Sequence, residues 1–244
     1  TPSGSQRYDG YWGRIHVPAN RDDGGSQSVE LAYFRLPGAD SSTTPTVVLS
    51  GGPGLSAIEQ YLCSGRATEQ IRALKASGDV IFLDQRGIGS SRPRLHSGLR
   101  WSLPLDRPLD RTDVVDHATR MLVDEAELWR RHGVDLSGFV TTEDADDIED
   151  VRRALGVEQI NLFGVSFGSH LALAVLRRHP DAIRCAVLAS VEGPDHTDKL
   201  PITMQQGLIE LDNRFTGTDS FHGAGILDLL AEALAKLEGG AGAI

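Results

Sequence analysis

The sequence is poor in cysteine, and this excludes several classes of protein. Only two of its 244 residues are cysteines, so neither a framework of disulfides nor a cysteine-rich zinc site is expected. We expect Cys63 and Cys185 to be separate small residues of the core, because one falls in a predicted helix and the other opens a predicted strand. Two such thiols leave the redox compartment, and with it the localisation, open.

Long apolar runs and an excess of basic residues are also missing. No stretch approaches the roughly 20 apolar residues of a transmembrane helix. Residues 1–6 lack the charged-then-apolar form of a secretory leader, which leaves open that a leader has been removed. With 24 basic against 34 acidic residues, the net charge is −10. Nucleic acid is therefore not an expected partner, and a small neutral or cationic molecule fits better.

The chain does contain an alternation of short apolar runs and longer helical patterns. Predicted strands cover 11–17, 29–36, 46–49, 79–83, 158–163 and 183–189, and helical spacing recurs at 58–74, 112–133, 141–155 and 171–176. The first two strands flank a turn-rich linker and predict an antiparallel hairpin at a sheet edge. The later alternation predicts an α/β fold, with a mostly parallel sheet and ligands at the carboxyl ends of its strands.

The last fifty residues change character. Residues 202–215 and 226–237 read as amphipathic helices with no strand between them. We therefore expect an α/β core over residues 1–195, and the beginning of a helical cap or lid over 196–244.

The segment 161–169 combines the end of a buried strand, a Gly-x-Ser-x-Gly turn and the start of a helix. Such a turn forces its serine into a strained backbone conformation, and close packing leaves room only for glycine on either side. Ser166 is therefore the predicted nucleophile. The amide of Phe167 opens the helix and would point toward an oxyanion, where the helix dipole also favours negative charge. A chance match in a chain with 27 glycines is the alternative.

Two further loops follow predicted strands. Residues 50–54 (Ser-Gly-Gly-Pro-Gly) let a backbone amide approach a ligand oxygen without an intervening Cβ. The alternative is a plain strand-to-helix turn. Residues 84–86 (Asp-Gln-Arg) can join neighbouring loops by hydrogen bonds, so we interpret them as scaffold. The acidic run at 143–150 is interpreted as a solvated helix face rather than a metal site.

Together the motifs at 50–54, 84–91 and 164–168 resemble those of the α/β-hydrolase serine peptidases typified by proline iminopeptidases and bacterial tripeptidyl aminopeptidases. The resemblance covers roughly residues 10–200. It implies an α/β-hydrolase fold, Ser166 as nucleophile, and an oxyanion hole formed by the amides of Gly52 and Phe167. It also implies hydrolysis of peptides from the amino terminus beneath a helical cap, with no metal or organic cofactor. Family sequences often have histidine in place of Ser50 and cysteine in place of His96.

The acid and base of a triad are not evident in this sequence. In this fold they follow the nucleophile on later strands, and no such strands are predicted after residue 189. Of the downstream histidines, His196 is nearest to a strand end, while His170, His179 and His222 are placed worse. We therefore expect the C-terminal part of the fold to be absent from this chain. A missing C-terminal segment or a second chain would supply the catalytic aspartate and histidine.

Glu192 leaves a strand at the predicted site and is a candidate for binding the ammonium group of a substrate. A helix cap or an ion pair with a loop arginine is the alternative. The leading interpretation is a serine hydrolase acting on peptides with a free amino terminus. The alternatives are a carboxylesterase or small-amide hydrolase of the same fold, and a hydrolase-like binding protein without catalysis.

Overall fold

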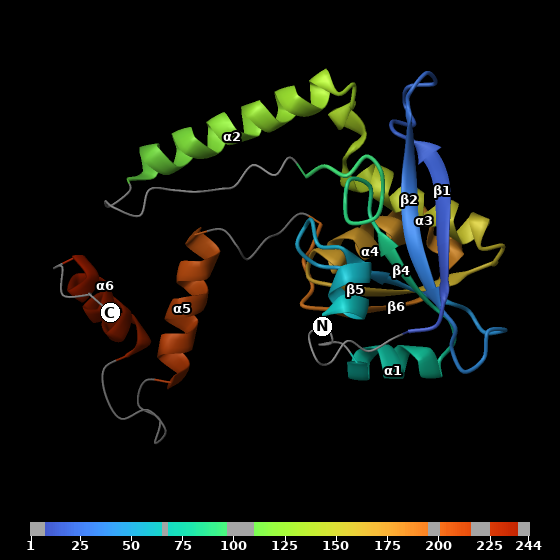
Figure 1. The fold of residues 1–244 in the computed structure, drawn as a ribbon. Helices are drawn as coiled ribbons and strands as arrows, with labels where there is room; N and C mark the ends of the chain where they lie inside the picture. Colours follow the sequence, from blue (N-terminus) through green and yellow to red (C-terminus); the bar gives the residue numbers. More distant parts are fainter. Residues whose placement is uncertain (1–7, 65–67, 97–109, 195–200, 216–224, 239–244) are drawn as a thin grey trace, which may run out of the picture. The chain divides into compact units, whose positions relative to one another are not determined.

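The computed structural model describes residues 8–64, 68–96, 110–194, 201–215 and 225–238 (Figure 1). The chain divides into two compact units, Thr1–Pro194 and Asp195–Ile244. The first unit is an α/β domain, and the described part of the second consists of two helices.

The α/β domain is built on a six-stranded sheet in the order β1-β2-β4-β3-β5-β6. Its strands are β1 (Tyr11–Pro18), β2 (Ser28–Leu36), β3 (Thr46–Leu49), β4 (Val80–Asp84), β5 (Ile160–Val165) and β6 (Ile183–Ala189). Strand β2 pairs antiparallel with β1 and β4, whereas β3 pairs parallel with β4 and β5, and β5 with β6. The predicted edge hairpin and the mostly parallel sheet are therefore both confirmed.

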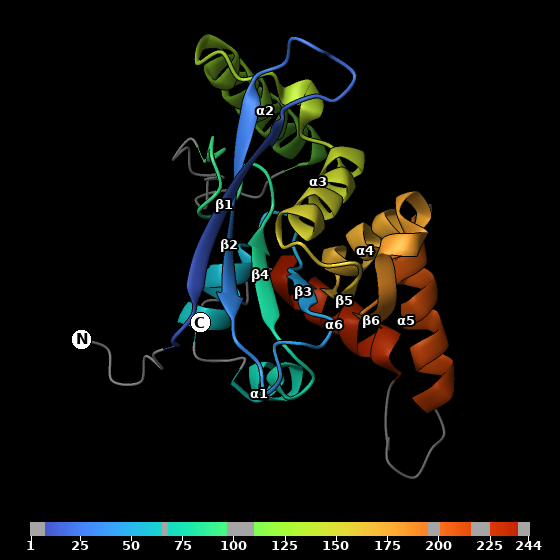
Figure 2. The same ribbon diagram turned by 90° about the vertical axis from the view of Figure 1, so that its right-hand side faces the viewer.

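Helices cover the middle of the sheet on both faces. Alternate residues of β3 belong to hydrophobic cores on opposite faces of the sheet. Val47 and Leu49 pack with α3 (Thr141–Ala154) and α4 (Phe167–Arg178), while Val48 faces the opposite side. That side is covered by the π-helix η1 (Glu59–Cys63) and α1 (Thr68–Ala76). Figure 2 shows α3 and α4 on the same side of the strands. Burial on both faces explains why the central strands are continuous apolar runs rather than alternating ones.

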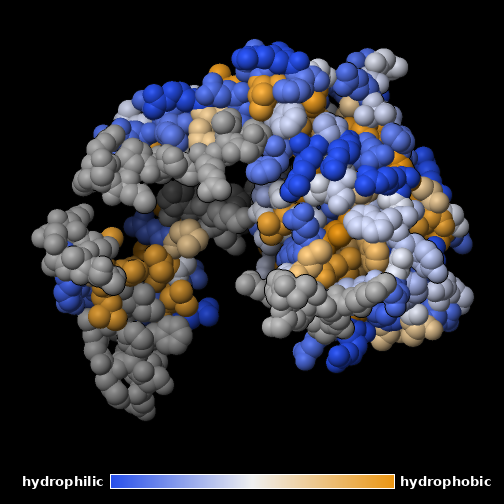
Figure 3. Space-filling view, viewed as in Figure 1, coloured by the Kyte–Doolittle hydropathy of each residue, from blue (hydrophilic) through white to orange (hydrophobic). Residues whose placement is uncertain are grey.

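Three further helices are α2 of the first unit and α5 and α6 of the second. Helix α2 (Arg111–Arg131) begins at a capping box in which Asp110 and Asp113 bond each other's backbone amides. In the second unit, α5 (Pro201–Phe215) and α6 (Ile226–Glu238) are amphipathic, as predicted. Apolar side chains are exposed on this pair, as Figure 3 shows. Among the described residues, no helix is long and apolar enough to cross a membrane.

Both cysteines differ from their predicted burial, since Cys63 and Cys185 are exposed. Cys185 lies on β6, the last strand of the sheet. On the face of the sheet that carries Cys185, η1 and α1 pack against residues of β2 to β5 and not against β6. An edge strand covered on one side only presents its other side chains to solvent, so Val187 is also 57% exposed. A strand that looked fully buried in the sequence is therefore half-exposed.

The acidic run on α3 is not the solvated face that the sequence suggested. Glu143, Asp147 and Glu149 are buried. The guanidinium of Arg86 binds both oxygens of Asp147, at 2.8 and 2.6 Å, and also donates to the backbone carbonyls of Ala19 and Gly138. Glu143 and Asp147 are paired with arginines from distant loops, and Glu149 with Arg152 and Arg153 of its own helix, because a buried carboxylate needs a counter-charge. Within the described residues no group of acidic, histidine or cysteine side chains could hold a metal ion.

Arg21 from the β1–β2 loop completes this network. It reaches three carboxylates on successive turns of α3, forming ion pairs with Glu143, with Asp147 at 2.9 Å and with Asp150 at 2.6 Å. Helix α3 begins after Val140, which provides no side-chain cap. The acids of the first turn of α3 therefore serve tertiary contacts rather than the helix end.

Asp144 lies at the edge of this network, and its environment makes stability depend on pH. Burial, reinforced by the negative charge of Asp147 and of Glu143, raises the pKa of Asp144 to about 7 although the backbone amide and charge of Arg86 oppose the shift. Its Oδ1 atom is buried without a hydrogen-bond partner. Because the folded-state pKa exceeds the unfolded one, the contribution of Asp144 to stability is fully present below about pH 4 and is lost as the pH rises through about 7.

We therefore expect Asp144→Asn to stabilise the protein at pH 8 relative to pH 5. Between these values its advantage over the parent chain should grow by about 2–3 kcal/mol, measured by urea unfolding. Asp146→Asn is the matched control on the same helix. Although burial opposes it, bonds from Arg178 and His179 lower the pKa of Asp146, so this variant should lose stability at pH 8. An advantage of Asp144→Asn that did not change with pH would contradict an ionisation near 7.

Candidate active site

Ser166 lies in the turn between β5 and α4, at the carboxyl edge of the parallel strands. Its backbone has φ 55° and ψ −124°, a conformation that residues with a side chain rarely adopt. Holding a non-glycine residue there costs about 1–3 kcal/mol, and such strain persists only where the surroundings impose it. The surroundings include a backbone bond of 3.0 Å from the Ser166 amide to the Ala189 carbonyl at the end of β6.

The glycines of the turn permit close packing of strand, turn and helix. A Cβ on Gly168 would lie 2.1 Å from the carbonyl oxygen of Leu49, and one on Gly164 would lie 2.5 Å from that of Gly168. Both obstacles are backbone atoms, which cannot swing aside as a side chain can. The two glycines are therefore required by α4 crossing directly over β3 and β5, as the sequence predicted.

The glycine loop after β3 lies against the serine. A Cβ built on Gly51 would come within 3.2 Å of the Ser166 Cβ and 3.7 Å of its Oγ. Gly52, the next residue, has φ 121°, which glycine alone adopts readily. Both glycines belong to the loop that the sequence predicted to approach a ligand oxygen, although the oxyanion role was predicted for Gly52 alone. The paired glycines were the available signal, since the first allows the loop to approach and the second allows it to turn.

Phe167 is the first residue of α4. The first four amides of an α-helix have no carbonyl partner within the helix, and the helix dipole makes this end partly positive. The ring of Phe167 stacks on His170 with centroids 5.7 Å apart. The backbone of Phe167 and the loop of Gly51 and Gly52 thus both adjoin Ser166.

Glu192 contacts the serine directly. The Ser166 hydroxyl donates a hydrogen bond of 2.9 Å to Oε1 of Glu192. The Glu192 backbone amide donates at 2.8 Å to Ser169 Oγ, and that hydroxyl donates at 2.6 Å to the Ser166 carbonyl. Sequence reasoning placed Glu192 near the site but missed Ser169, whose only signal was a hydroxyl one helical turn after the nucleophile.

The described histidines do not contact the Ser166 hydroxyl. The Nδ1 atom of His170 lies 3.2 Å from the Gly193 carbonyl, on the first turn of α4. His179 is at the far end of α4, where its ring lies 2.7 Å from Asp146. His196 and His222 lie outside the described residues. In the part of the chain that the structure describes, no histidine therefore occupies the position of a general base.

The Asp-Gln-Arg segment is scaffold, as predicted. Asp84 is buried and accepts hydrogen bonds from Ser56 Oγ at 2.7 Å and from the Ser90 amide at 2.8 Å. Burial raises the pKa of Asp84, and these bonds oppose the rise. Gly89 passes so close that a Cβ there would lie 2.1 Å from a carboxylate oxygen of Asp84. Asp84 thereby joins the glycine loop to the loop after β4.

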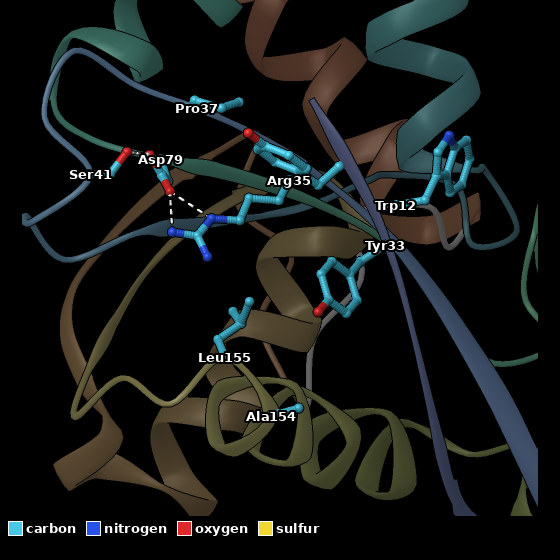
Figure 4. A pocket seen from close by; sticks show the side chains of 9 residues that line it. Trp12, Tyr33, Arg35, Pro37, Ser41, Asp79, Ala154 and Leu155 are labelled. Atoms are coloured by element: carbon cyan, nitrogen blue, oxygen red, sulfur yellow. Dashed lines mark hydrogen bonds and ion pairs between the residues drawn. The ribbon is translucent and has the colours of Figure 1, made fainter. Parts of the chain in front are cut away.

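A separate hollow of about 470 Å³ lies away from the serine, toward the amino ends of the parallel strands (Figure 4). Its walls include Tyr33, Arg35, Asp79 and Leu155. Asp79 is saturated, with bonds from Arg35 at 2.6 Å, Ser41 at 2.7 Å and the Gly38 amide at 2.9 Å. Burial opposes ionisation of Asp79, but these donors outweigh it and lower its pKa. The charged groups of this hollow, Arg35 and Asp79, therefore make structural contacts with each other and with the neighbouring loop.

Comparison with known proteins places this geometry in context. The family model described as alpha/beta hydrolase fold matches residues 44–224. Tripeptidyl aminopeptidase of Streptomyces lividans is 28% identical over 196 residues, which is 77% of this chain and 36% of that protein. Proline iminopeptidase of Heyndrickxia coagulans is 26% identical over 198 residues, covering 78% of this chain and 52% of that protein.

Serine protease Hip1 of Mycobacterium tuberculosis is 25% identical over 191 residues, covering 75% of this chain and 36% of that protein. The chain thus spans about a third to a half of the length of these curated relatives.

Proposed function

Because the chain belongs to the alpha/beta hydrolase fold family, we propose that it is a serine hydrolase in which Ser166 attacks peptides that have a free amino terminus. The observation that carries the proposal is the backbone of Ser166, whose φ of 55° at the carboxyl end of β5 lies in a region that residues with a side chain rarely adopt. Strain of this kind is retained where a reactive side chain must be presented. A glycine loop against the same serine supports the assignment.

The proposed reaction is acyl transfer to water. The Ser166 oxygen bonds to the carbonyl carbon of the substrate while its proton passes to a general base. The amides of Gly52 and Phe167 stabilise the oxyanion, each such donor being worth roughly 3 kcal/mol in the transition state. The base returns its proton to the leaving amine as the C–N bond breaks. Water then hydrolyses the acyl-serine ester and regenerates the hydroxyl.

The proposed reaction also needs a general base and an acid that orients it. In the described residues no histidine contacts Ser166, and the sheet ends at β6. The fold places its acid and base after the nucleophile in chain order. We assign both to a further C-terminal segment or to a second chain, either of which would approach the site beyond β6.

The preference for peptides with a free amino terminus rests on Glu192. Its carboxylate adjoins the nucleophile, where it can offer a counter-charge to an ammonium ion. Two relatives, an aminopeptidase and an iminopeptidase, support the same substrate class. The second candidate is a carboxylesterase or small-amide hydrolase of the same site, which requires no carboxylate beside the serine. A binding protein without catalysis is the third, and the unassigned base favours it.

Labelling with a serine-directed fluorophosphonate tests the proposal. The experiment uses the protein purified from the cells that naturally produce it, so that any further segment or partner chain is present. We expect one label, located at Ser166 by mass spectrometry and abolished in Ser166→Ala. A protein that is folded and remains unlabelled would exclude the hydrolase and leave the binding protein. Labelling together with cleavage of esters but not of free-amine peptides would favour the esterase.

A further inference from the structure

We propose that Ser169 is a positioning residue, which orients the amide of Phe167 toward the oxyanion of the transition state. This inference rests on the proposed function and adds to the site a side chain that is fully buried and does not contact a substrate. It comes from the two bonds of the Ser169 hydroxyl. That hydroxyl donates at 2.6 Å to the carbonyl of Ser166 and accepts at 2.8 Å from the amide of Glu192.

The carbonyl that Ser169 binds belongs to the same peptide group as the Phe167 amide. A trans peptide group is planar, and its C=O and N–H bonds point in opposite directions. The group that fixes the Ser166 carbonyl therefore also fixes the direction of the Phe167 N–H. The carbonyl is directed along α4 toward Ser169, so the N–H is directed out of the amino end of the helix. The helix dipole favours an oxyanion at that end.

The strained backbone of Ser166 explains why the carbonyl needs this support. Ser166 is the N-cap of α4, and an N-cap residue usually has an extended backbone and caps the helix with its own side chain. Here φ is 55° and ψ is −124°, and the side chain makes no capping bond. Relaxation of such a backbone would turn the peptide groups on both sides. The Ala189 carbonyl holds the preceding group at 3.0 Å, and the amide and hydroxyl of Ser169 hold the following one at 2.8 and 2.6 Å.

The direction of the Ser169 hydroxyl proton follows from its two partners. A hydroxyl has one proton to donate and two lone pairs to accept with. The Glu192 amide can only donate, so it occupies a lone pair and leaves the proton for the Ser166 carbonyl. Because Ser169 is 0% exposed, solvent does not compete for that proton. The bond to the carbonyl is therefore a fixed part of the turn.

An ordinary helix contact is the alternative explanation. A serine within a helix often donates to the carbonyl three or four residues before it, and such a bond affects the helix alone. In this case the acceptor is the carbonyl of the nucleophile itself. The second partner of Ser169 lies on the segment that follows β6, so one hydroxyl joins the turn to the end of the neighbouring strand. An ordinary contact would affect stability only, whereas a positioning role affects the rate.

Ser169→Ala tests the inference in the protein purified from the cells that naturally produce it. Fluorophosphonate labelling to completion counts the molecules with a reactive Ser166, and rates are expressed per labelled serine. We expect kcat to fall roughly 10–100-fold for both alanine p-nitroanilide and N-acetyl-alanine p-nitrophenyl ester, because outright loss of an oxyanion donor costs roughly 10²–10³-fold. KM for the anilide should stay within about two-fold, since the lost interaction acts in the transition state.

N-acetyl-alanine trifluoromethyl ketone supplies a measurement that a purely structural role would not change. The Ser166 oxygen bonds to the ketone carbon, its proton passes to the general base, and the carbonyl electron pair becomes an oxyanion beside the Phe167 amide. This adduct resembles the transition state, so its inhibition constant should rise in Ser169→Ala by the factor by which kcat falls.

Ser91→Ala is the matched control. Ser91 is also fully buried, and its hydroxyl likewise accepts from one backbone amide, that of Ala32 at 2.9 Å, and donates to one carbonyl, that of Asp84 at 2.7 Å. Its loss should lower the melting temperature about as much as Ser169→Ala does, while kcat and the inhibition constant stay unchanged. Ser169→Cys keeps the size of the side chain but has a weak donor, so it should reproduce the loss of kcat even where Ser169→Ala does not fold.

The outcomes separate this inference from the proposed function. Ser169→Ala protein with the parent kcat per labelled serine would overturn the inference, whatever its melting temperature. A loss through KM alone, or a loss of kcat with unchanged affinity for the ketone, would also overturn it, because the oxyanion hole would then be intact. In each of these cases, hydrolysis that depends on Ser166 would still support a serine hydrolase. A parent protein that is neither labelled nor able to hydrolyse either substrate would contradict the proposed function and this inference with it.

Discussion

Ser166→Ala is expected to lower kcat by about a million-fold. Removal of a nucleophilic serine leaves only the rate that binding and the oxyanion donors supply, and measured losses in serine hydrolases are of that order. The fold should survive, because alanine fits the same backbone and the lost hydroxyl makes a single side-chain bond, to Glu192. Steady-state rates on alanine p-nitroanilide and on N-acetyl-alanine p-nitrophenyl ester measure the loss, and circular dichroism checks the fold.

Ser42→Ala is the control for this substitution. Ser42 is an exposed serine in the loop before β3, where its hydroxyl bonds Asp40, and its loss should leave both rates unchanged. Purified Ser166→Ala protein that kept more than about a thousandth of the parent rate would remove Ser166 from the mechanism.

Arg86→Met is expected to cost the largest share of stability. The Arg86 side chain is 1% exposed and its partner Asp147 is 3% exposed. Breaking a buried pair from one side leaves an uncompensated charge, which costs about 3–5 kcal/mol. The carbonyls of Ala19 and Gly138 would lose their donor as well. For a chain of this size the melting temperature should fall by roughly 6–20 °C.

Two further variants make this prediction specific. Arg153→Met removes an arginine from α3, the helix that carries Asp147. Arg153 is 66% exposed, so its pair with Glu149 should contribute less than about 1 kcal/mol. Arg86→Met combined with Asp147→Leu removes the orphaned charge, and should recover part of the lost melting temperature. A double variant no more stable than Arg86→Met alone would show that the loss comes from the carbonyl contacts instead.

Local patterns in the sequence predicted most of the sheet. Val47, Val48 and Leu49 are apolar without alternation, which marks a strand covered on both faces, and Gly164 and Gly168 mark the tight crossing of strand and helix. These features depend on neighbours in the chain. The helix periods were equally informative, since α2, α3 and α6 begin and end within a few residues of their predicted bounds.

The failures involve contacts between distant parts of the chain. The acids of α3 have the spacing of a solvated face, and only the fold brings Arg86 and Arg21, 61 and 126 residues away from Asp147, into contact with them. Cys185 looked buried because a strand's sequence does not reveal whether another element covers it. Glu192 could be placed at a strand end, but its bond to Ser166 depends on the turn at Ser190.

The exposed edge of β6 bears on how this chain behaves when it is produced alone. In the described part of the sheet, β6 pairs with β5 on one side, so the backbone groups of its outer side are a template for strands of other molecules. Val187 adds an exposed apolar side chain to that edge, and Cys185 adds an exposed thiol. Arg184, also exposed, opposes stacking of identical edges by charge repulsion. The isolated chain will therefore aggregate most readily at high salt, and oxidation will make its aggregates covalent through Cys185.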